Sequence, residues 1–257
     1  MITLDMAIDK TSTPRIAQLD TSAFAPSDVL NLILQRSEII RDQDNYNSYI
    51  QAWIRGETVP LEALVAQIGQ DTLIRRAAAF ILFEYEELFP IIAANPPLAV
   101  TDIGCGYAFF DLFLAQDFDC NLTLIDLEHT NERHFGFQQT GAGYSSLAVA
   151  AASLGLNGLD PDRIQTLNPE RRSIADIRDQ DLVVSFISCG FHYPWTTYET
   201  FFKDAVKPDG KIILDVRRRT LSETLSGMAS LGDVVDLDAG ASPKAARIAV
   251  TRGPHTA

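Results

Sequence analysis

Beyond residue 97 the chain alternates between short apolar runs and amphipathic stretches, and this alternation limits the possible folds more than any other feature. Strands separated by helices favour a mostly parallel sheet, because a parallel return to the same sheet needs a long crossover. The last two apolar runs have only a short Gly/Ser/Pro segment between them and therefore predict an antiparallel pair. We expect strands at 98–103, 121–126, 163–167, 181–187, 210–216, 233–238 and 246–252.

The chain up to residue 94 has a different pattern, with apolar residues at helical spacing and no convincing strand. Ser27 is a plausible N-cap for one helix, and Asp71 for another that ends near Pro90. The Asn-Pro-Pro sequence at 95–97 marks a boundary. We therefore predict two regions: residues 1–94, a helical cap, lid or dimerisation region, and residues 95–257, the sheet domain that carries the site.

Charge and cysteine content limit the partners. The formal net charge is −13, and an acidic chain repels phosphate backbones, so a nucleic acid is not an expected partner. The three cysteines, Cys105, Cys120 and Cys189, are far apart and form no CxxC pair, which argues against a disulfide framework or a structural zinc. The sequence shows no signal peptide and no apolar run long enough for a bilayer. A cytoplasmic protein without a membrane partner is expected.

Two glycines stand one residue apart after the first apolar run, in AVTDIGCGYAFFDLFLA at 99–115. Gly104 and Gly106 allow a ligand to approach the main chain closely, because glycine has no Cβ and tolerates positive φ. A helix that begins near Phe109 would add unpaired N–H groups and partial positive charge. The dinucleotide fingerprint G-x-G-x-x-G fails, since Phe109 occupies its third glycine position.

Two carboxylates lie beside this turn in the sequence. Asp102 precedes the first glycine, where it could orient the turn or receive a ligand ammonium group. Asp126 ends the next apolar run, twenty residues after Gly106, where a carboxylate can accept hydrogen bonds from two ribose hydroxyls. The alternative for Asp126 is a helix cap or a surface acid. The pattern predicts places for a ribose and for a zwitterionic tail at the carboxyl edge of the sheet.

Four segments stand in this order along the chain: VTDIGCGYAFFDLFLA, LTLIDLE, QDLVVSFISCGFHYPW and AVKPDGKIILDVRR. Together they resemble the class I S-adenosylmethionine-dependent methyltransferases of the bacterial small-molecule type. The resemblance implies an α/β, Rossmann-like fold: a seven-stranded, mostly parallel sheet with an antiparallel last strand, helices on both faces and an N-terminal helical extension. The chain departs from the family at Ala108, where GxGxG has its third glycine, and at Asp209, within the usual PGG turn.

The resemblance also implies which residues bind S-adenosyl-L-methionine. Asp102 and the turn of Gly104, Cys105 and Gly106 would hold the methionine part, Asp126 the ribose, and Leu127 would lie against the adenine. Asn168 matches the position near the adenine amino group only loosely, and the alternative is a turn residue before Pro169. Ser188, at the end of the fourth predicted strand, could touch cofactor or substrate.

We expect the methyl acceptor to bind at the loop after the fourth predicted strand, SFISCGFHYPWTTY. This loop lacks the Asn/Asp-Pro-Pro-Tyr/Phe motif that amino-group methyltransferases often have here. His192 is a candidate general base for a hydroxyl, because histidine ordinarily titrates near neutral pH. Tyr193 and Trp195 are candidate acceptor contacts. The alternatives are a histidine with a packing or structural hydrogen-bonding role and aromatic residues that belong to the core.

A second candidate acceptor segment follows the second predicted strand. The long loop from His129 to Gly143 contains His134 and precedes Tyr144, and both are candidate substrate contacts, although a plain surface loop is equally consistent. No spacing such as HExxH supports a metal site. Three arginines at 217–219 could meet an anionic acceptor or form a solvated charge run.

The sequence therefore predicts an S-adenosylmethionine-dependent methyltransferase that acts on a small-molecule acceptor, with an oxygen acceptor on a sugar or secondary metabolite favoured. A homodimer is a possible assembly. Two alternatives are an NAD(P)-dependent oxidoreductase on a similar sheet and a non-catalytic S-adenosylmethionine-binding module. The missing third glycine and the lack of a Tyr-x-x-x-Lys pair argue against the first, and the intact Gly104, Gly106 and Asp126 argue against the second.

Overall fold

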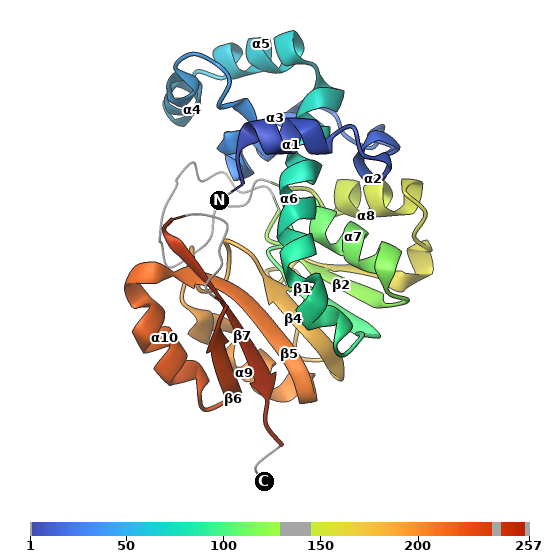
Figure 1. Ribbon diagram of the computed structural model, residues 1–257, viewed down its shortest axis with the longest axis vertical. Helices are drawn as coiled ribbons and strands as arrows, with labels where there is room; N and C mark the ends of the chain where they lie inside the picture. Colours follow the sequence, from blue (N-terminus) through green and yellow to red (C-terminus); the bar gives the residue numbers. More distant parts are fainter. Residues whose placement is uncertain (1, 129–144, 238–242, 255–257) are drawn as a thin grey trace.

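A computed structural model describes residues 2–128, 145–237 and 243–254. Its centre is one seven-stranded sheet with the order β3-β2-β1-β4-β5-β7-β6 (Figure 1). Strand β7 runs antiparallel to both of its neighbours, and the other pairings are parallel. All seven predicted strands and the antiparallel final pair are confirmed. The strands are β1 (Ala99–Ile103), β2 (Asn121–Ile125), β3 (Ile164–Leu167), β4 (Gln180–Ser185), β5 (Val206–Arg217), β6 (Gly232–Asp236) and β7 (Ala245–Arg252).

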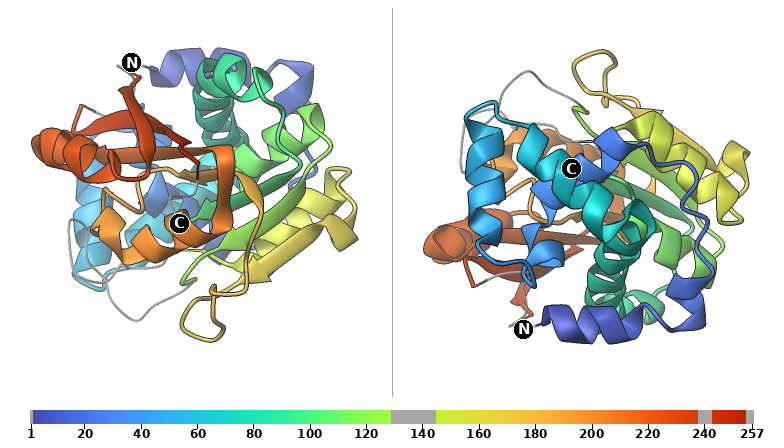
Figure 2. Two further views of the ribbon diagram at one scale, coloured as in Figure 1. Left: turned by 90° about the horizontal axis from the view of Figure 1, so that it is seen from below. Right: turned by 90° about the horizontal axis from the view of Figure 1, so that it is seen from above.

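Helices cover both faces of the sheet, because the central strands are apolar on both sides. One face packs against α6 (Gln70–Ala93), α7 (Phe109–Asp117) and α8 (Leu147–Leu156), whose buried side chains share one cluster with Val100, Leu122 and Val184. The other face packs against α9 (Glu199–Ala205) and α10 (Leu221–Met228). The view from below shows the two layers on either side of the strands (Figure 2, left).

The N-terminal region is helical, as predicted, and no strand occurs between residues 2 and 97. Its apolar side chains belong to the same buried cluster as α7 and the central strands, so the core crosses the boundary predicted at residues 95–97. Helices α4 and α5 lie nearest the viewer when the molecule is seen from above (Figure 2, right). The helices that precede α6 are α1 (Leu4–Lys10), α2 (Pro14–Ala17), α3 (Pro26–Gln35), α4 (Tyr46–Ile54) and α5 (Val59–Ile68).

Both predicted N-caps in this region are wrong. Helix α3 begins one residue before Ser27, because Pro26 occupies the first helical position with φ already suited to a helix. Ala25 is the N-cap residue, and its N–H donates to Asp28 Oδ2 at 2.9 Å. Helix α6 begins at Gln70 after the cap residue Gly69, so Asp71 lies within its first turn.

The parallel register brings three loops to one edge of the sheet. Asp102 of β1 lies opposite Leu124 of β2 and Val184 of β4, so the carboxyl ends of these three strands lie together. In open α/β sheets, ligands bind beyond these ends. The loops after β1, β2 and β4 carry most of the residues that the sequence singled out.

Candidate functional site

The turn between β1 and α7 is left-handed at both glycines. Gly104 has φ +79° and Gly106 has φ +57°, a region that glycine reaches without a steric penalty. The N–H groups of Gly104 and Cys105 both donate to the carbonyl of Ile125, at 2.7 and 3.2 Å. These bonds tie the turn to the end of β2.

Ala108, which replaces the third glycine, is left-handed as well, with φ +57°. This residue is the N-cap of α7, so the conformation is needed to enter the helix. A left-handed conformation costs a residue with a Cβ roughly 1–2 kcal/mol. The turn therefore keeps the glycine-type backbone at a position where the side chain is a methyl group.

Two side chains approach the glycines of the turn closely. A Cβ built on Gly104 would lie 2.5 Å from the Cβ of Ser188 and closer still to its Oγ. A Cβ on Gly106 would lie 2.9 Å from Oε1 of Gln35. The sequence suggested only a ligand as the group that approaches this main chain. In the described residues, side chains from the β4 loop and from α3 also do so.

Asp126, directly after β2, is held by three donors. The N–H of Gly106 donates to Oδ2 at 3.0 Å, and the N–H of Glu128 and the hydroxyl of Ser145 donate to Oδ1 at 2.8 and 2.7 Å. Burial raises the pKa of this carboxyl even though all three bonds favour its charged form. A carboxylate has about four acceptor positions, so one remains for a further hydroxyl donor.

A pair of buried acids lies close to the turn. Asp102 of β1 is 4% exposed and Asp111 of α7 is 0% exposed. Among the described residues, Oδ1 of Asp102 and both carboxyl oxygens of Asp111 have no hydrogen-bond donor. Burial raises the pKa of Asp111 to about 7, and burial together with the neighbouring Asp111 raises the pKa of Asp102 well above its ordinary value. Two buried like charges disfavour each other, so this environment favours the protonated form of at least one of the two carboxyls. This side of the turn is therefore suited to a cationic group.

Asn168, after β3, shapes the same edge through its own contacts. Its Nδ2 donates to the carbonyl of Leu127 at 2.9 Å, and its Oδ1 accepts from the N–H of Glu170 at 3.0 Å. The second bond is the turn contact expected of an Asn before a proline. Leu127 and Cys105 are partly exposed beside it in the two neighbouring turns. Their contacts with a ligand stay predictions.

Helix α3 docks directly onto the glycine turn. The hydroxyl of Tyr107, the residue after Gly106, donates to Asp28 Oδ1 at 2.9 Å and accepts from Asn31 Nδ2 at 3.1 Å. Burial raises the pKa of this phenol far above its ordinary value. Asp28, Asn31 and Gln35 are spaced three and four residues apart and so lie on one side of the helix. The N-terminal region thus presents a polar stripe to the turn.

The loop after β4 is held next to the turn by a serine. The Ser185 hydroxyl donates to the carbonyl of Ile103 at 2.6 Å and accepts from the N–H of Cys189 at 2.9 Å. Ile187 has φ +51°, a strained conformation for a β-branched residue. The strain lies one residue before Ser188, whose hydroxyl is 3.1 Å from the Tyr193 hydroxyl.

His192 lies partly buried in this loop. Its backbone N–H donates to the carbonyl of Ser188 at 2.8 Å, and its ring meets Phe191 edge-on, with centroids 5.2 Å apart. Arg217 fixes the other side of Phe191: its Nε donates to the Phe191 carbonyl at 2.6 Å and its guanidinium lies 4.7 Å from the ring centroid. His192 therefore stands on a loop whose backbone is held from two sides.

Other candidates from the sequence have packing or structural contacts, or fall outside the described residues. Trp195 packs against Gly227 of α10, where a Cβ would meet its ring at 2.9 Å. Arg218 donates to the Ala245 carbonyl at 3.0 Å, so the arginine run has structural contacts. The predicted contacts His134 and Tyr144 fall within residues 129–144, outside the described residues. Among the residues that the structure describes, no group of three metal-ligand side chains occurs.

Sequence reasoning missed three residues of this site: Gln35, Asp111 and Ser145. Gln35 lies 70 residues before Cys105 in the chain, and nothing local to it signals a contact with the turn. Asp111 stands on an otherwise apolar helical stretch, and this misplaced charge is a signal that could have marked it. Ser145 precedes α8 and looks like an ordinary residue of a helix entry.

No protein-family model and no curated protein matches the chain. Solved structures do. A candidate O-methyltransferase from Nostoc punctiforme PCC 73102 superposes with a TM-score of 0.51 at 14% identity, over 96% of this chain and 73% of that one. A ribosomal protein methylase from Lactobacillus delbrueckii subsp. bulgaricus gives a TM-score of 0.46 at 17% identity, over 68% and 77% of the two chains.

At these identities the likeness concerns the fold. The chain has the fold of the class I S-adenosylmethionine-dependent methyltransferases: a seven-stranded sheet with an antiparallel last strand and helices on both faces. Fold alone does not fix the reaction, which depends on the residues of the site. Among the described residues, no helix is long and apolar enough to cross a membrane.

Proposed function

We propose that this protein is an S-adenosylmethionine-dependent methyltransferase. The observation that carries the proposal is the pairing of the left-handed turn at Gly104 and Gly106 with the Asp126 carboxylate, 3.0 Å from the Gly106 N–H. The pair stands at the carboxyl edge of the sheet, where such folds bind ligands. A glycine turn beside a carboxylate on the next strand suits a ligand with a ribose and an amino-acid tail.

The residues present fit this cofactor. Asp126 has one acceptor position left for a ribose hydroxyl, and the acidic pair of Asp102 and Asp111 suits a cationic ligand. When bound, S-adenosylmethionine supplies a methyl group on a sulfonium cation. The residues that we expect to hold it are Asp102, Gly104, Cys105, Gly106, Asp126, Leu127, Asn168 and Ser188.

We propose a small-molecule acceptor with a hydroxyl group, on a sugar or secondary metabolite. The loop after β4 lacks the Asn/Asp-Pro-Pro-Tyr/Phe motif of amino-group methyltransferases. His192 lies in this loop, whose backbone is held by hydrogen bonds. A nitrogen of its ring would accept the hydroxyl proton as the acceptor oxygen becomes a nucleophile. Tyr193 and Trp195, together with His134 and Tyr144, are the proposed acceptor contacts. The loop would contribute alignment, which is a large part of what a bimolecular transfer needs.

Residues 1–94 are proposed to act as a cap over the site. The contacts of Asp28 and Asn31 with Tyr107 support this role, because they place α3 against the glycine turn. A cap excludes water from a reactive ligand and adds surface to an acceptor pocket. The alternative role, a homodimer contact, would show as a doubled mass in light scattering.

Isothermal titration calorimetry of the full-length protein tests the proposal. S-adenosylhomocysteine should bind at one saturable site, whereas NADH should give no heat of binding. Binding of NADH alone would favour an oxidoreductase and overturn the proposal. Binding of S-adenosylhomocysteine without methyl transfer to any of a panel of hydroxyl and amine acceptors would favour a non-catalytic binding module.

A further inference from the structure

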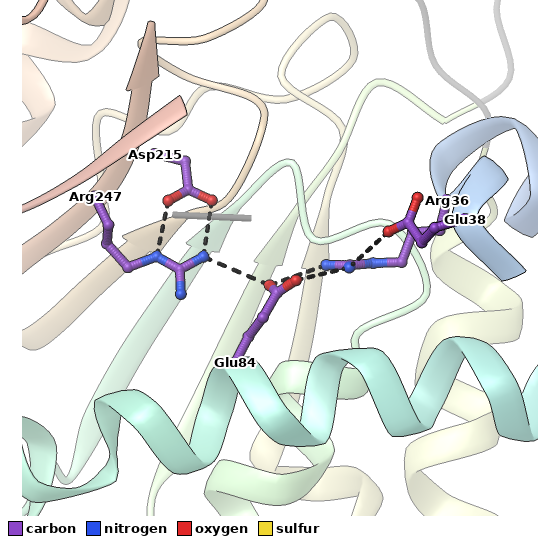
Figure 3. Close-up of polar contacts among 5 residues, drawn as sticks. All are labelled: Arg36, Glu38, Glu84, Asp215 and Arg247. Atoms are coloured by element: carbon purple, nitrogen blue, oxygen red, sulfur yellow. Dashed lines mark hydrogen bonds and ion pairs between the residues drawn. The ribbon is translucent and has the colours of Figure 1, made fainter. Parts of the chain in front are cut away.

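Four charged side chains, three of them buried and Arg36 partly exposed, form a chain from the N-terminal helices to the sheet (Figure 3). The guanidinium of Arg36, directly after α3, donates to both carboxyl oxygens of Glu84 on α6, at 2.8 and 3.1 Å. Nη2 of Arg247 on β7 lies 3.5 Å from Oε2 of Glu84. Arg247 also holds both oxygens of Asp215 on β5, at 2.8 and 2.9 Å. The charges alternate along the chain, so each buried ion has an opposite neighbour.

This ion network is shielded from water. Glu84 is 4% exposed, and Asp215 and Arg247 are both 0% exposed. Attraction to Arg36 and Arg247 lowers the pKa of Glu84 against the effect of its burial, so the carboxylate is charged. Such a network adds little net stability over apolar packing, but loss of one partner leaves an uncompensated buried charge. The network therefore acts mainly by fixing the positions of the segments that it joins.

The network ends next to the glycine turn. Arg36 follows Gln35 in the chain, and the side chain of Gln35 is the group that a Cβ on Gly106 would meet at 2.9 Å. Gln35 is exposed, whereas the preceding residue Leu34 is buried, so the side chain of Gln35 lies outside the apolar core. The two hydrogen bonds between Arg36 and Glu84 thus fix the backbone next to Gln35.

The same network contacts the loop after β4. The guanidinium of Arg247 lies 4.7 Å from the centroid of the Phe186 ring, which packs on Phe110 at 4.6 Å. Phe186 is the first residue after β4, two positions before Ser188. The ion network therefore contacts two segments of the chain, one that carries Gln35 and one that carries Ser188. These are the two side chains that lie against the glycine turn.

We propose that Gln35 is a residue of the cofactor site and that Glu84 is a positioning residue, which acts on the bound ligand by holding Arg36 and so Gln35. This inference rests on the proposed function. The amide of Gln35 offers a donor and an acceptor to the polar amino-acid or ribose part of the ligand above Gly106. The N-terminal region then contributes directly to ligand affinity, rather than only covering a site that is complete without it.

Calorimetry with S-adenosylhomocysteine on the full-length protein tests the Gln35 contact. Gln35→Ala should weaken binding about fivefold to tenfold, the effect of losing one hydrogen bond to a polar or charged group. Gln51→Ala is the matched control, because Gln51 is an exposed glutamine of the same region on α4, and it should bind like the wild type. A Gln35→Ala variant within twofold of the wild type would overturn the inference while leaving the proposed function intact.

A double-mutant cycle tests the role of Glu84. Glu84→Gln should weaken S-adenosylhomocysteine binding by a factor similar to that of Gln35→Ala, and the double variant should be no weaker than Gln35→Ala alone. A merely structural role would instead give additive losses. Additive losses would therefore remove Glu84 from the inference.

Two further results complete the test. If Glu84→Gln does not fold, as its thermal unfolding would show, Arg36→Lys replaces it in the cycle, since it keeps the charge but loses the two-point geometry. If the wild type binds no S-adenosylhomocysteine, the proposed function fails, and this inference fails with it. The two failures are thus told apart by the wild-type titration.

Discussion

Ser188 occupies the space into which any side chain at position 104 would project. A Cβ on Gly104 would lie 2.5 Å from the Cβ of Ser188, and the φ of Gly104 is +79°. The strict need for glycine at this point therefore has a cause within the protein, in addition to any ligand. The contact also shows how closely the β1 turn and the β4 loop approach one another at the candidate site.

Gly104→Ala should destabilise the protein by about 2–4 kcal/mol, the sum of the left-handed backbone penalty and of the overlap with Ser188. Ser188→Gly in the same chain should recover the part due to overlap, and Ser188→Ala should recover less because it keeps the Cβ. Urea unfolding of the single and double variants measures these differences. Equal stability of Gly104→Ala with and without Ser188→Gly would show that the overlap does not matter.

Asp126→Asn should weaken S-adenosylhomocysteine binding at least tenfold. Three donors point at the carboxylate, from Gly106, Glu128 and Ser145, and an amide NH₂ would face at least one of them. Calorimetry measures the change, with Asp162→Asn as the control because Asp162 is exposed and lies on a different loop. Unchanged affinity in Asp126→Asn would remove this carboxylate from the ligand site.

Asp111→Asn should raise stability at pH 8 more than at pH 4.5. Burial raises the pKa of Asp111 to about 7, from an ordinary value of 3.8. The unfolded chain loses the proton near pH 4 while the folded chain keeps it, so the wild type loses stability as pH rises from about 4 to about 7. Asn cannot ionise and avoids this loss. Thermal unfolding at the two pH values measures the effect, and an equal shift at both would contradict a raised pKa of Asp111 in the folded protein.

His192→Ala should lower the rate of methyl transfer about a hundredfold or more, the usual effect of losing a general base, while S-adenosylhomocysteine affinity stays within twofold of the wild type. The rate is measured as S-adenosylhomocysteine release with the best hydroxyl acceptor from a panel. Calorimetry on the same preparation serves as the control. An unaltered rate would remove His192 from the proposed mechanism.

The sheet could be predicted closely from the sequence because alternation in hydrophobicity reports directly on strands and crossover helices. The predicted strand at 121–126 is observed at Asn121–Ile125, and the pair at the end of the chain is antiparallel as expected. The N-caps predicted at Ser27 and Asp71 are wrong, because the backbone of Pro26 and Gly69 decides where those helices begin.

The candidate site was predictable only where a residue stands within a local motif. Gly104, Gly106 and Asp126 follow strands at recognisable spacing, and the structure brings them together. The contacts of Gln35 with the turn and of Glu84 with Arg247 depend on how α3 and α6 pack in space. Hydrophobic periodicity predicts that such helices exist and which face is buried, but it does not say which polar residue will stand over a distant loop.

The apolar cluster that runs from Leu4 in α1 to Ala249 in β7 has a consequence for engineering. Because the inner faces of α6 and α7 bury one another's side chains, residues 95–257 expressed alone would expose a large apolar surface and aggregate. A chimera designed to accept a different substrate would have to exchange the first five helices and keep α6 with its native sheet.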